Sequence, residues 1–291
     1  MTSRKQTFFI GILTLIATGL GLISCDNDRN LVPAFIVINK EDITVQCNLF
    51  EGCAVHDFSD VWVKVNGKHL GCWELPARIP VLDQGNCNIV INAGIILNGM
   101  KSSHSAYSFF NPFEITANLE PRKETRINPK FTYLDNITVP FTENFQGSGG
   151  IKFIPSPDSQ ADISALGVVE LNDTAIYFDL RTENLNLRND GTYRTFFEFN
   201  YNIEAESNKE VSIGVGLIAV SSNGNTTHHP IVMINPTRGQ WKKIYVDLSQ
   251  IVGQNSSARS FILQITGFRE TDKAVKFQFG NMRILQHLSY F

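Results

Sequence analysis

Side chains that could carry chemistry are scattered along this chain rather than grouped in a catalytic pattern. The sequence contains no Gly-x-Ser-x-Gly nucleophile turn, no His-Glu-x-x-His zinc motif and no Gly-Lys-Ser/Thr phosphate loop. His228 and His229 are adjacent, and adjacent strand residues point to opposite faces, so they do not easily chelate one ion. We expect them in a solvent-facing loop. We predict that the protein is not an enzyme.

The cysteines offer a second kind of chemistry. Five are present, and Cys25 stands apart from Cys47, Cys53, Cys72 and Cys87. An even number of cysteines in an oxidising compartment is typical of disulfides, and four cysteines allow three pairings. Proximity in the sequence favours Cys47 with Cys53 and Cys72 with Cys87. Buried free thiols are the alternative, and no Cys-x-x-Cys or nearby histidine spacing indicates a metal site.

Residues 1–24 have the parts of a signal peptide. Arg4 and Lys5 precede a mostly apolar run over 7–23, and small Ser24 ends the segment. The run is at or just under the roughly 18–20 residues of a membrane span, so an uncleaved transmembrane anchor is the alternative.

The residues at the end of this segment carry a resemblance. Leu22-Ile23-Ser24-Cys25 resembles a bacterial lipobox, which implies a covalent lipid on Cys25 and a tether over 25–33. Asp26 and Asp28 are similar to the acidic export signal of Bacteroidota surface lipoproteins, although a solvated linker would also be polar. The resemblance implies a lipid-anchored outer-membrane protein that is exposed on the cell surface.

Composition limits the fold and the partners. The formal charge is −3, from 25 Lys and Arg against 28 Asp and Glu, which argues against a nucleic-acid partner. The 21 phenylalanines, recurrent turn residues and missing helical periodicity after the signal predict an all-β protein. We expect two β-domains, over residues 34–134 and 135–291.

The first predicted domain contains a clear hairpin. Residues 60–66 alternate apolar and polar side chains, and Asn66-Gly67 is typical of a type I′ turn. With Leu70-Gly71, Pro80 and residues 85–91, this run is similar to a PEGA-type β-domain. The resemblance implies a small Ig-like or PEGA-like module that binds rather than catalyses.

An aromatic run follows around an Asn-Pro turn signal. Its rings are Tyr107, Phe109, Phe110 and Phe113. Phenylalanine is usually buried, so a core position is one interpretation. Aromatic residues are also enriched at interface centres, so a partner-contact patch is the other.

The second predicted domain is a series of strands with one apolar face each, which indicates a two-sheet sandwich. The apolar face shifts by one residue after Phe279, and this shift predicts a β-bulge at Gly280-Asn281. Residues 239–248 and 277–284 are similar to the closing strands of galactose-binding-like jelly rolls, which resemble carbohydrate-binding modules.

The jelly-roll resemblance implies two kinds of site. Many such domains hold a structural calcium, and Glu143 matches the first ligand. Gly280 and Asn281 stand where the second carboxylate is expected, and calcium prefers charged oxygens, so we predict no metal. Sugar platforms need aromatic rings, and the candidates are Trp62, Trp73, Trp241 and Tyr245, with Trp241 expected to cap the core.

The sequence leaves two binding functions open, beside a third reading in which the protein is a hydrolase. The first is a non-catalytic lipoprotein that acts as a protein-binding scaffold subunit of an outer-membrane complex for barrel assembly, secretion or uptake. The alternative is a glycan-binding lipoprotein that serves nutrient uptake. Neither requires a cofactor beyond the lipid on Cys25.

Overall fold

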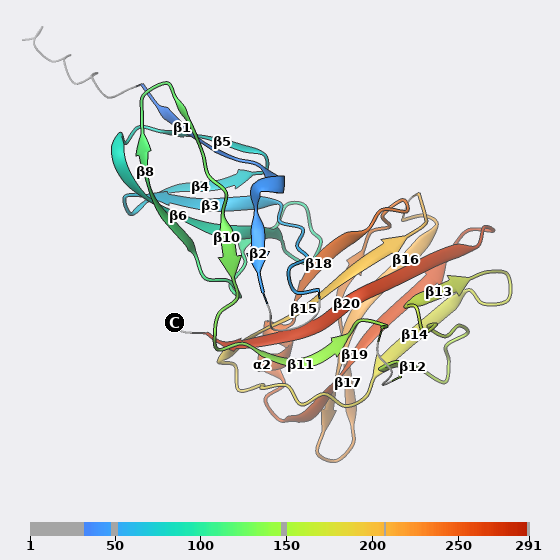
Figure 1. The fold of residues 1–291 in the computed structure, drawn as a ribbon. Coiled ribbons are helices and arrows are strands. Elements are labelled where there is room, and N and C mark those ends of the chain that lie inside the picture. The colour runs from blue at the N-terminus through green and yellow to red at the C-terminus, as the bar shows by residue number, and fades with distance from the viewer. Residues whose placement is uncertain (1–31, 48–51, 147–149, 207, 290–291) are drawn as a thin grey trace, which may run out of the picture.

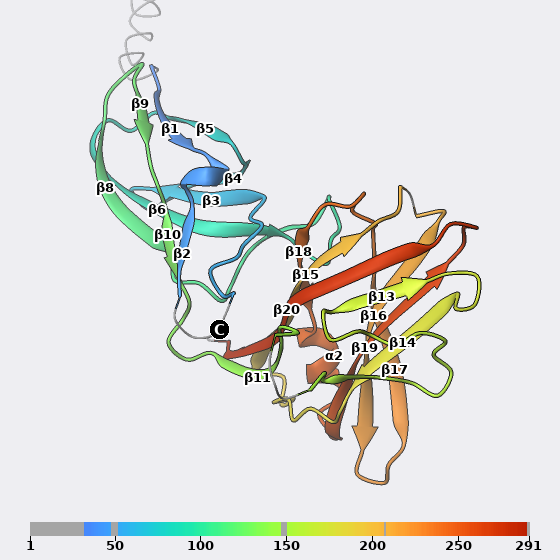
Figure 2. The same cartoon turned by 45° about the vertical axis from the view of Figure 1, so that its right-hand side comes forward.

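The structure is a computed structural model that describes residues 32–47, 52–146, 150–206 and 208–289. Its regular elements are almost all strands, which confirms the all-β prediction. The predicted signal peptide, Cys25, Asp26 and Asp28 lie outside the described residues. The ribbon forms two lobes, and β1 begins at the end of the first lobe that is remote from the second (Figures 1 and 2).

The described part of the first lobe, residues 32–47 and 52–134, contains three sheets. Their strand orders are β5-β1-β9, β10-β2 and β4-β3-β6-β7, with β8 also paired to β6. The elements are β1 (Ala34–Ile38), the 3-10 turn η2 (Lys40–Asp42), β2 (Thr44–Gln46), β3 (Asp60–Val65), β4 (Lys68–Glu74), β5 (Ala77–Val81), β6 (Gly85–Ile96), β7 (His104–Ala106), β8 (Phe113–Leu119), β9 (Glu124–Arg126) and β10 (Lys130–Thr132).

The predicted hairpin joins β3 to β4. Asn66 and Gly67 have φ values of 49° and 79°, as a type I′ turn requires. On β3, Val61, Val63 and Val65 are buried in the lobe's core, and the residues between them face the other side of the sheet. The alternation in the sequence therefore sets which face of this sheet is covered.

The cysteine prediction is half right. Cys47 and Cys53 form a disulfide with their Cα atoms 5.9 Å apart, whereas Cys72 and Cys87 are free thiols. Strand β3 lies between β4 and β6, so the strands of Cys72 and Cys87 do not touch. Cys72 is opposite Trp62 and Trp62 is opposite Asn92, which is about five strand residues, or roughly 17 Å, from Cys87. A disulfide cannot span that separation.

The second lobe is a sandwich of two five-stranded sheets. Their orders are β11-β20-β15-β18, with β13 paired to β20, and β12-β14-β19-β16-β17. The elements are β11 (Thr138–Glu143), β12 (Phe153–Pro155), β13 (Val168–Leu171), β14 (Tyr177–Thr182), β15 (Tyr193–Ile203), β16 (Val211–Ser221), β17 (Thr226–Ile234), β18 (Lys242–Asp247), the helix α2 (Ser249–Gln254), β19 (Ala258–Arg269) and β20 (Val275–Leu288).

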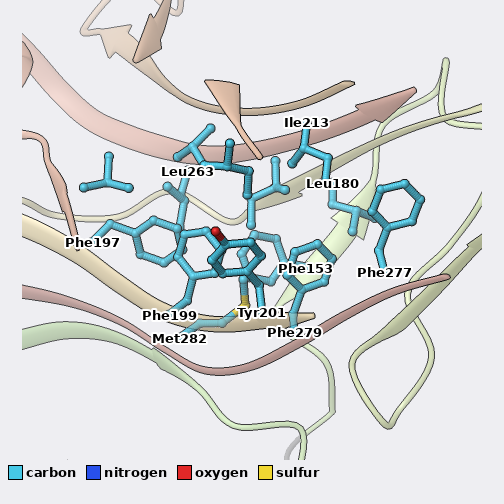
Figure 3. Close-up of a cluster of buried hydrophobic side chains, with 14 of the residues drawn as sticks. Phe153, Leu180, Phe197, Phe199, Tyr201, Ile213, Leu263, Phe277, Phe279 and Met282 are labelled. Carbon is cyan, nitrogen blue, oxygen red and sulfur yellow. The ribbon is translucent and has the colours of Figure 1, made fainter. Parts of the chain in front are cut away.

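Side chains from both sheets fill the space between them. Phe199, Phe277 and Phe279 come from one sheet, and Leu180 and Leu263 come from the other (Figure 3). All five are buried, so burial of their apolar surface stabilises the sandwich.

The predicted bulge is present in β20. Glu198 pairs with Arg283 and Asn200 pairs with Gly280, so two residues of β20 oppose one residue of β15. Asn281, within the bulge, has a φ of 48°. Because the bulge shifts the alternation by one, Phe279 and Met282 both enter the core while Arg283 points to the outer face of the sheet.

The aromatic run is buried at the junction of the two lobes. Tyr107, Phe109 and Phe110 belong to one buried cluster with Phe196 and Leu285 of the second lobe. The prediction that this run contacts an outside partner is therefore wrong for these three rings, because the second lobe of the same chain covers them. Phe113 lies apart from them on β8, half-buried against the first-lobe core.

A buried ionic cluster lies beside these rings. The Glu198 carboxylate is 2.6 Å from the Lys243 ammonium and 3.0 Å from the Arg283 guanidinium, and it accepts a hydrogen bond from the Tyr107 hydroxyl. Burial alone would raise the pKa of Glu198, but the two cations outweigh it and the pKa is lowered. Lys243 also donates to the Val55 carbonyl at 2.8 Å, which extends the cluster across the junction.

Candidate binding groove

The outer face of the β12-β14-β19-β16-β17 sheet carries the best-formed candidate site. Strand register sets its side chains in rows, because laterally paired residues share a face. One row runs Asp179, Thr266, Gly214 and Met233 across β14, β19, β16 and β17. The next row runs Arg181, Gln264, Gly216 and Pro230. The sheet faces away from the first lobe, which contacts the other sheet through β15, β18 and β20.

Two glycines form the floor of a groove of about 310 Å³. Gly214 and Gly216 occupy successive outward positions of β16, where side chains would otherwise fill the space. A Cβ at Gly214 would lie 2.9 Å from the Thr266 hydroxyl oxygen, and one at Gly216 would lie 3.3 Å from Gln264 Oε1. The groove therefore exists because these two residues lack side chains.

Polar side chains form a wall at one side of the groove: Gln264 lines the groove, and Asp179 and Arg181 lie beyond it on the next strand. Asp179 is buried and accepts hydrogen bonds from Arg181 Nη2 at 2.6 Å and from Gln264 Nε2 at 2.9 Å. The Arg181 side chain is 32% exposed, so part of the guanidinium remains open to a ligand. Because the carboxylate and the guanidinium pair with each other, the wall offers donors and acceptors without a net charge.

Apolar surface borders the polar wall. Met233 is 65% exposed and lines the groove, and Phe268 is 38% exposed on the same face, two residues along β19 from Thr266 and outside the lining. Tyr177 pairs with Phe268, so two rings stand next to each other on this face. Burial raises the pKa of Tyr177, so its phenol stays protonated to a higher pH than that of an exposed tyrosine.

The two histidines are placed differently from the prediction. His228 and His229 lie in β17, not in a loop. They do point to opposite faces as adjacent strand residues, and His228 lines the groove. Pro230 follows them in the edge strand of the sheet, where a missing N–H costs no ladder bond.

The aromatic candidates do not gather into a sugar platform. Trp62 and Trp73 are half-buried in the first lobe, and Tyr245 is buried at the junction. Trp241 was expected to cap the core but is 54% exposed, with its ring packed against Gly280. The expectation was wrong because Trp241 precedes β18 and so lies outside the alternation that fills the sandwich.

The carboxylate of Glu143, the weak calcium candidate, already accepts hydrogen bonds from backbone amides. Its two carboxylate oxygens accept hydrogen bonds from the amides of Phe145 and Lys152, each at 2.8 Å. Asn281, which stands where the second ligand was expected, lies close to Gly52 of the first lobe. Glu143 is opposite Met282 in the β11-β20 pair, and both Glu143 and Asn281 contact other parts of the chain.

A larger hollow of about 850 Å³ lies between the lobes. Charged side chains line much of it, and several pair with each other, as in Lys40–Asp57 at 2.5 Å and Arg238–Glu206 at 3.7 Å. Because these charged groups already pair with each other, we interpret the hollow as a solvent-filled seam between the lobes rather than as a binding site. The groove has the better candidate surface because its polar wall and apolar rims face outward together.

Comparison with known proteins gives weak likenesses only. No protein-family model matches the chain, and no curated protein sequence matches it. Among solved structures, the CBM22-1 xylan-binding domain of Paenibacillus barcinonensis Xyn10C is 10% identical at a TM-score of 0.38, covering 54% of this chain and 99% of that chain. The C-terminal family 22 carbohydrate-binding module of Clostridium thermocellum Xyn10B is 16% identical at 0.35, covering 52% and 92%. The agarase AgWH50C is 11% identical at 0.36, covering 54% and 25%.

Proposed function

We propose that this protein binds a neutral glycan in the groove on the outer face of the β14-β19-β16-β17 surface. The observation that carries the proposal is the two-glycine floor at Gly214 and Gly216, flanked by a polar wall and apolar rims. Ligand sites are typically concave, mostly apolar surfaces with a few placed polar groups.

The chemistry of the groove matches the chemistry of a sugar. Sugar hydroxyls both donate and accept, and Gln264, Thr266 and His228 offer both kinds of partner. The C–H faces of sugar rings are apolar and suit the exposed surface of Met233 in the groove, and a longer glycan could also reach Phe268 on the same face. Since Asp179 neutralises Arg181, a neutral glycan fits this wall better than a polyanion.

The structure leaves less support for the scaffold role predicted from the sequence. That role was based on two domains on a lipid tether, few charges and the aromatic run, and the second lobe covers Tyr107, Phe109 and Phe110 of that run. We therefore favour glycan binding without catalysis over the scaffold role.

Gln264→Ala should weaken glycan binding at least tenfold, since a lost hydrogen bond of about 1.4 kcal/mol corresponds to that factor. Gly214→Val should abolish binding by filling the floor. The measurement is isothermal titration calorimetry of the chain with neutral xylo-, cello- and agaro-oligosaccharides.

Gln240→Ala is the matched control, because Gln240 is an exposed glutamine that lines the seam between the lobes instead of the groove. The Gln240→Ala variant should bind the oligosaccharides with the same affinity as the unaltered chain. Absence of binding to every oligosaccharide, or equal affinity in all variants, would rule out the groove as a glycan site.

We also propose that a lipid on Cys25 anchors the protein to the outer membrane, where it would present bound glycan to an uptake system. The lipobox resemblance of residues 22–25 supports this placement. Within the described ranges, none of the helices has the length and apolar character needed to cross a membrane.

Cys25→Ala should move the protein from the membrane fraction to the soluble fraction, because multiple acyl chains give stable anchoring at about 0.8 kcal/mol per buried CH₂. Fractionation followed by immunoblotting measures the shift. Cys87→Ala is the cysteine control and should stay with the membranes; retention of the Cys25→Ala variant in the same fraction contradicts a lipid anchor.

A further inference from the structure

Three side chains that bind transition metals meet on the first lobe. Asp60 of β3, Cys72 of β4 and His104 of β7 place one ligand atom each within 4.8 Å of the others. Asp60 Oδ1 is 3.1 Å from Cys72 Sγ, and Asp60 Oδ2 is 2.7 Å from His104 Nδ1. Asp60 is the centre of the cluster and is completely buried.

The sheet brings these residues together through a glycine. Asp60 pairs with Gly94 of β6, and Gly94 pairs with Ala106 of β7, two residues from His104. A Cβ at Gly94 would overlap the Asp60 carboxylate, so the missing side chain lets Asp60 lie across β6. Cys72 is on the same face, two residues along β4 from Glu74, the partner of Asp60.

The set of donors has a distinct chemical preference. A thiolate and an imidazole together favour ions such as Zn²⁺ over Ca²⁺ or Mg²⁺, which prefer oxygen alone. One thiolate and one carboxylate would balance the charge of a divalent ion, with His104 neutral. Typical Zn–S and Zn–N bonds are about 2.3 and 2.0 Å, so small rotations of Cys72 and His104 away from Asp60 would admit the ion.

The surroundings suit a held ion that solvent can reach. The Ser59 hydroxyl donates to Asp60 Oδ2 at 2.6 Å and so orients the carboxylate from outside the cluster. Cys72 is exposed and the His104 side chain is 25% exposed, so an ion can enter from solvent. This open side also leaves room for a water molecule as a fourth ligand.

We propose that Asp60, Cys72 and His104 form a binding site for one divalent transition-metal ion of the Zn²⁺ class. The site lies on the first lobe and is separate from the groove. The proposed metal binding is therefore independent of the proposed glycan binding. The hydrogen bonds now joining the three side chains would be replaced by bonds to the ion.

The test uses the full chain after treatment with a chelator. Titration with Zn²⁺ should show one equivalent bound, and Co²⁺ should give a thiolate-to-cobalt charge-transfer band. Cys72→Ser should keep the hydrogen bond to Asp60 and therefore the fold. It should lose the band and weaken Zn²⁺ binding at least ~100-fold, because even outer-shell partners of a metal cost 10–100-fold when removed.

Two controls separate the site from adventitious binding. His69→Ala removes an exposed histidine of the same sheet, and Cys87→Ala removes the other free thiol; both should bind Zn²⁺ as the unaltered chain does. His104→Ala should lose binding. Absence of one-equivalent binding, or Zn²⁺ affinity that Cys72→Ser leaves unchanged, would overturn the proposal.

Discussion

Replacing Glu198 with alanine should lower the free energy of unfolding by about 3–5 kcal/mol. The substitution removes the carboxylate that both Lys243 and Arg283 contact, while their side chains remain 3% and 2% exposed. Arg283 would then lose the carboxylate that offsets its buried charge, and Lys243, whose pKa burial already lowers to about 8, would lose the group that raises it. Urea denaturation followed by tryptophan fluorescence measures the loss.

Glu204→Ala is the control, because Glu204 is exposed near the end of the same strand, and the unfolding free energy of this variant should change by less than about 0.5 kcal/mol.

The pH dependence of stability in the intact protein gives a second check. Because the pKa of Glu198 is depressed below its usual 4.5, its stabilisation is present above that pH and is lost as the pH falls through the folded-state value. Equal acid sensitivity of the Glu198→Ala variant and the intact protein would contradict this role.

Phe109→Ala should cost about 3–5 kcal/mol of stability, the usual range for truncating a buried phenylalanine. The ring has no exposed surface and lies 5.5 Å from the Phe196 ring and 4.6 Å from the His287 ring, both in the second lobe. The substitution would leave a cavity between the lobes. Thermal unfolding monitored by circular dichroism measures the effect.

Phe113→Ala serves as the matched variant, since Phe113 belongs to the same aromatic run but is only half-buried on β8. Its loss of stability should be clearly smaller. If Phe109→Ala and Phe113→Ala were equally mild, the junction would not be a packed core, and the run would again be available to a partner.

Local alternation in the sequence is enough to predict much of the fold. The valines of 61–65 and the hairpin at Asn66-Gly67 need only neighbouring residues to specify face and turn. The bulge at Gly280-Asn281 is also visible in the sequence, because it shifts the apolar face by one residue.

Strand order is what the sequence does not reveal. The pairing of Cys72 with Cys87 was predicted from their nearness along the chain, yet β3 separates their strands. The cluster of Asp60 with His104 joins residues 44 positions apart, and a glycine on a third strand makes room for it. No motif of fixed spacing describes such a cluster.

The groove was missed for a related reason. Gly214 and Gly216 are two residues apart on a strand, which is a readable signal for a bare patch on one face. Its meaning depends on Gln264 and Thr266, which lie fifty residues away in the sequence and beside the glycines in the sheet. The aromatic run has the same ambiguity, because a sequence does not say whether a partner surface belongs to another molecule or to the same chain.

The packed junction between the lobes also fixes where the groove lies relative to the N-terminal end of the first lobe. The described chain starts at the end of the first lobe remote from the second, and the glycine-floored sheet lies on the opposite side of the second lobe (Figures 1 and 2). Because packed aromatic rings and hydrogen bonds join the lobes, we expect the two lobes to move as one rigid body. Under the proposed lipid anchor, a glycan bound in the groove would therefore be held on the side of the protein away from the membrane.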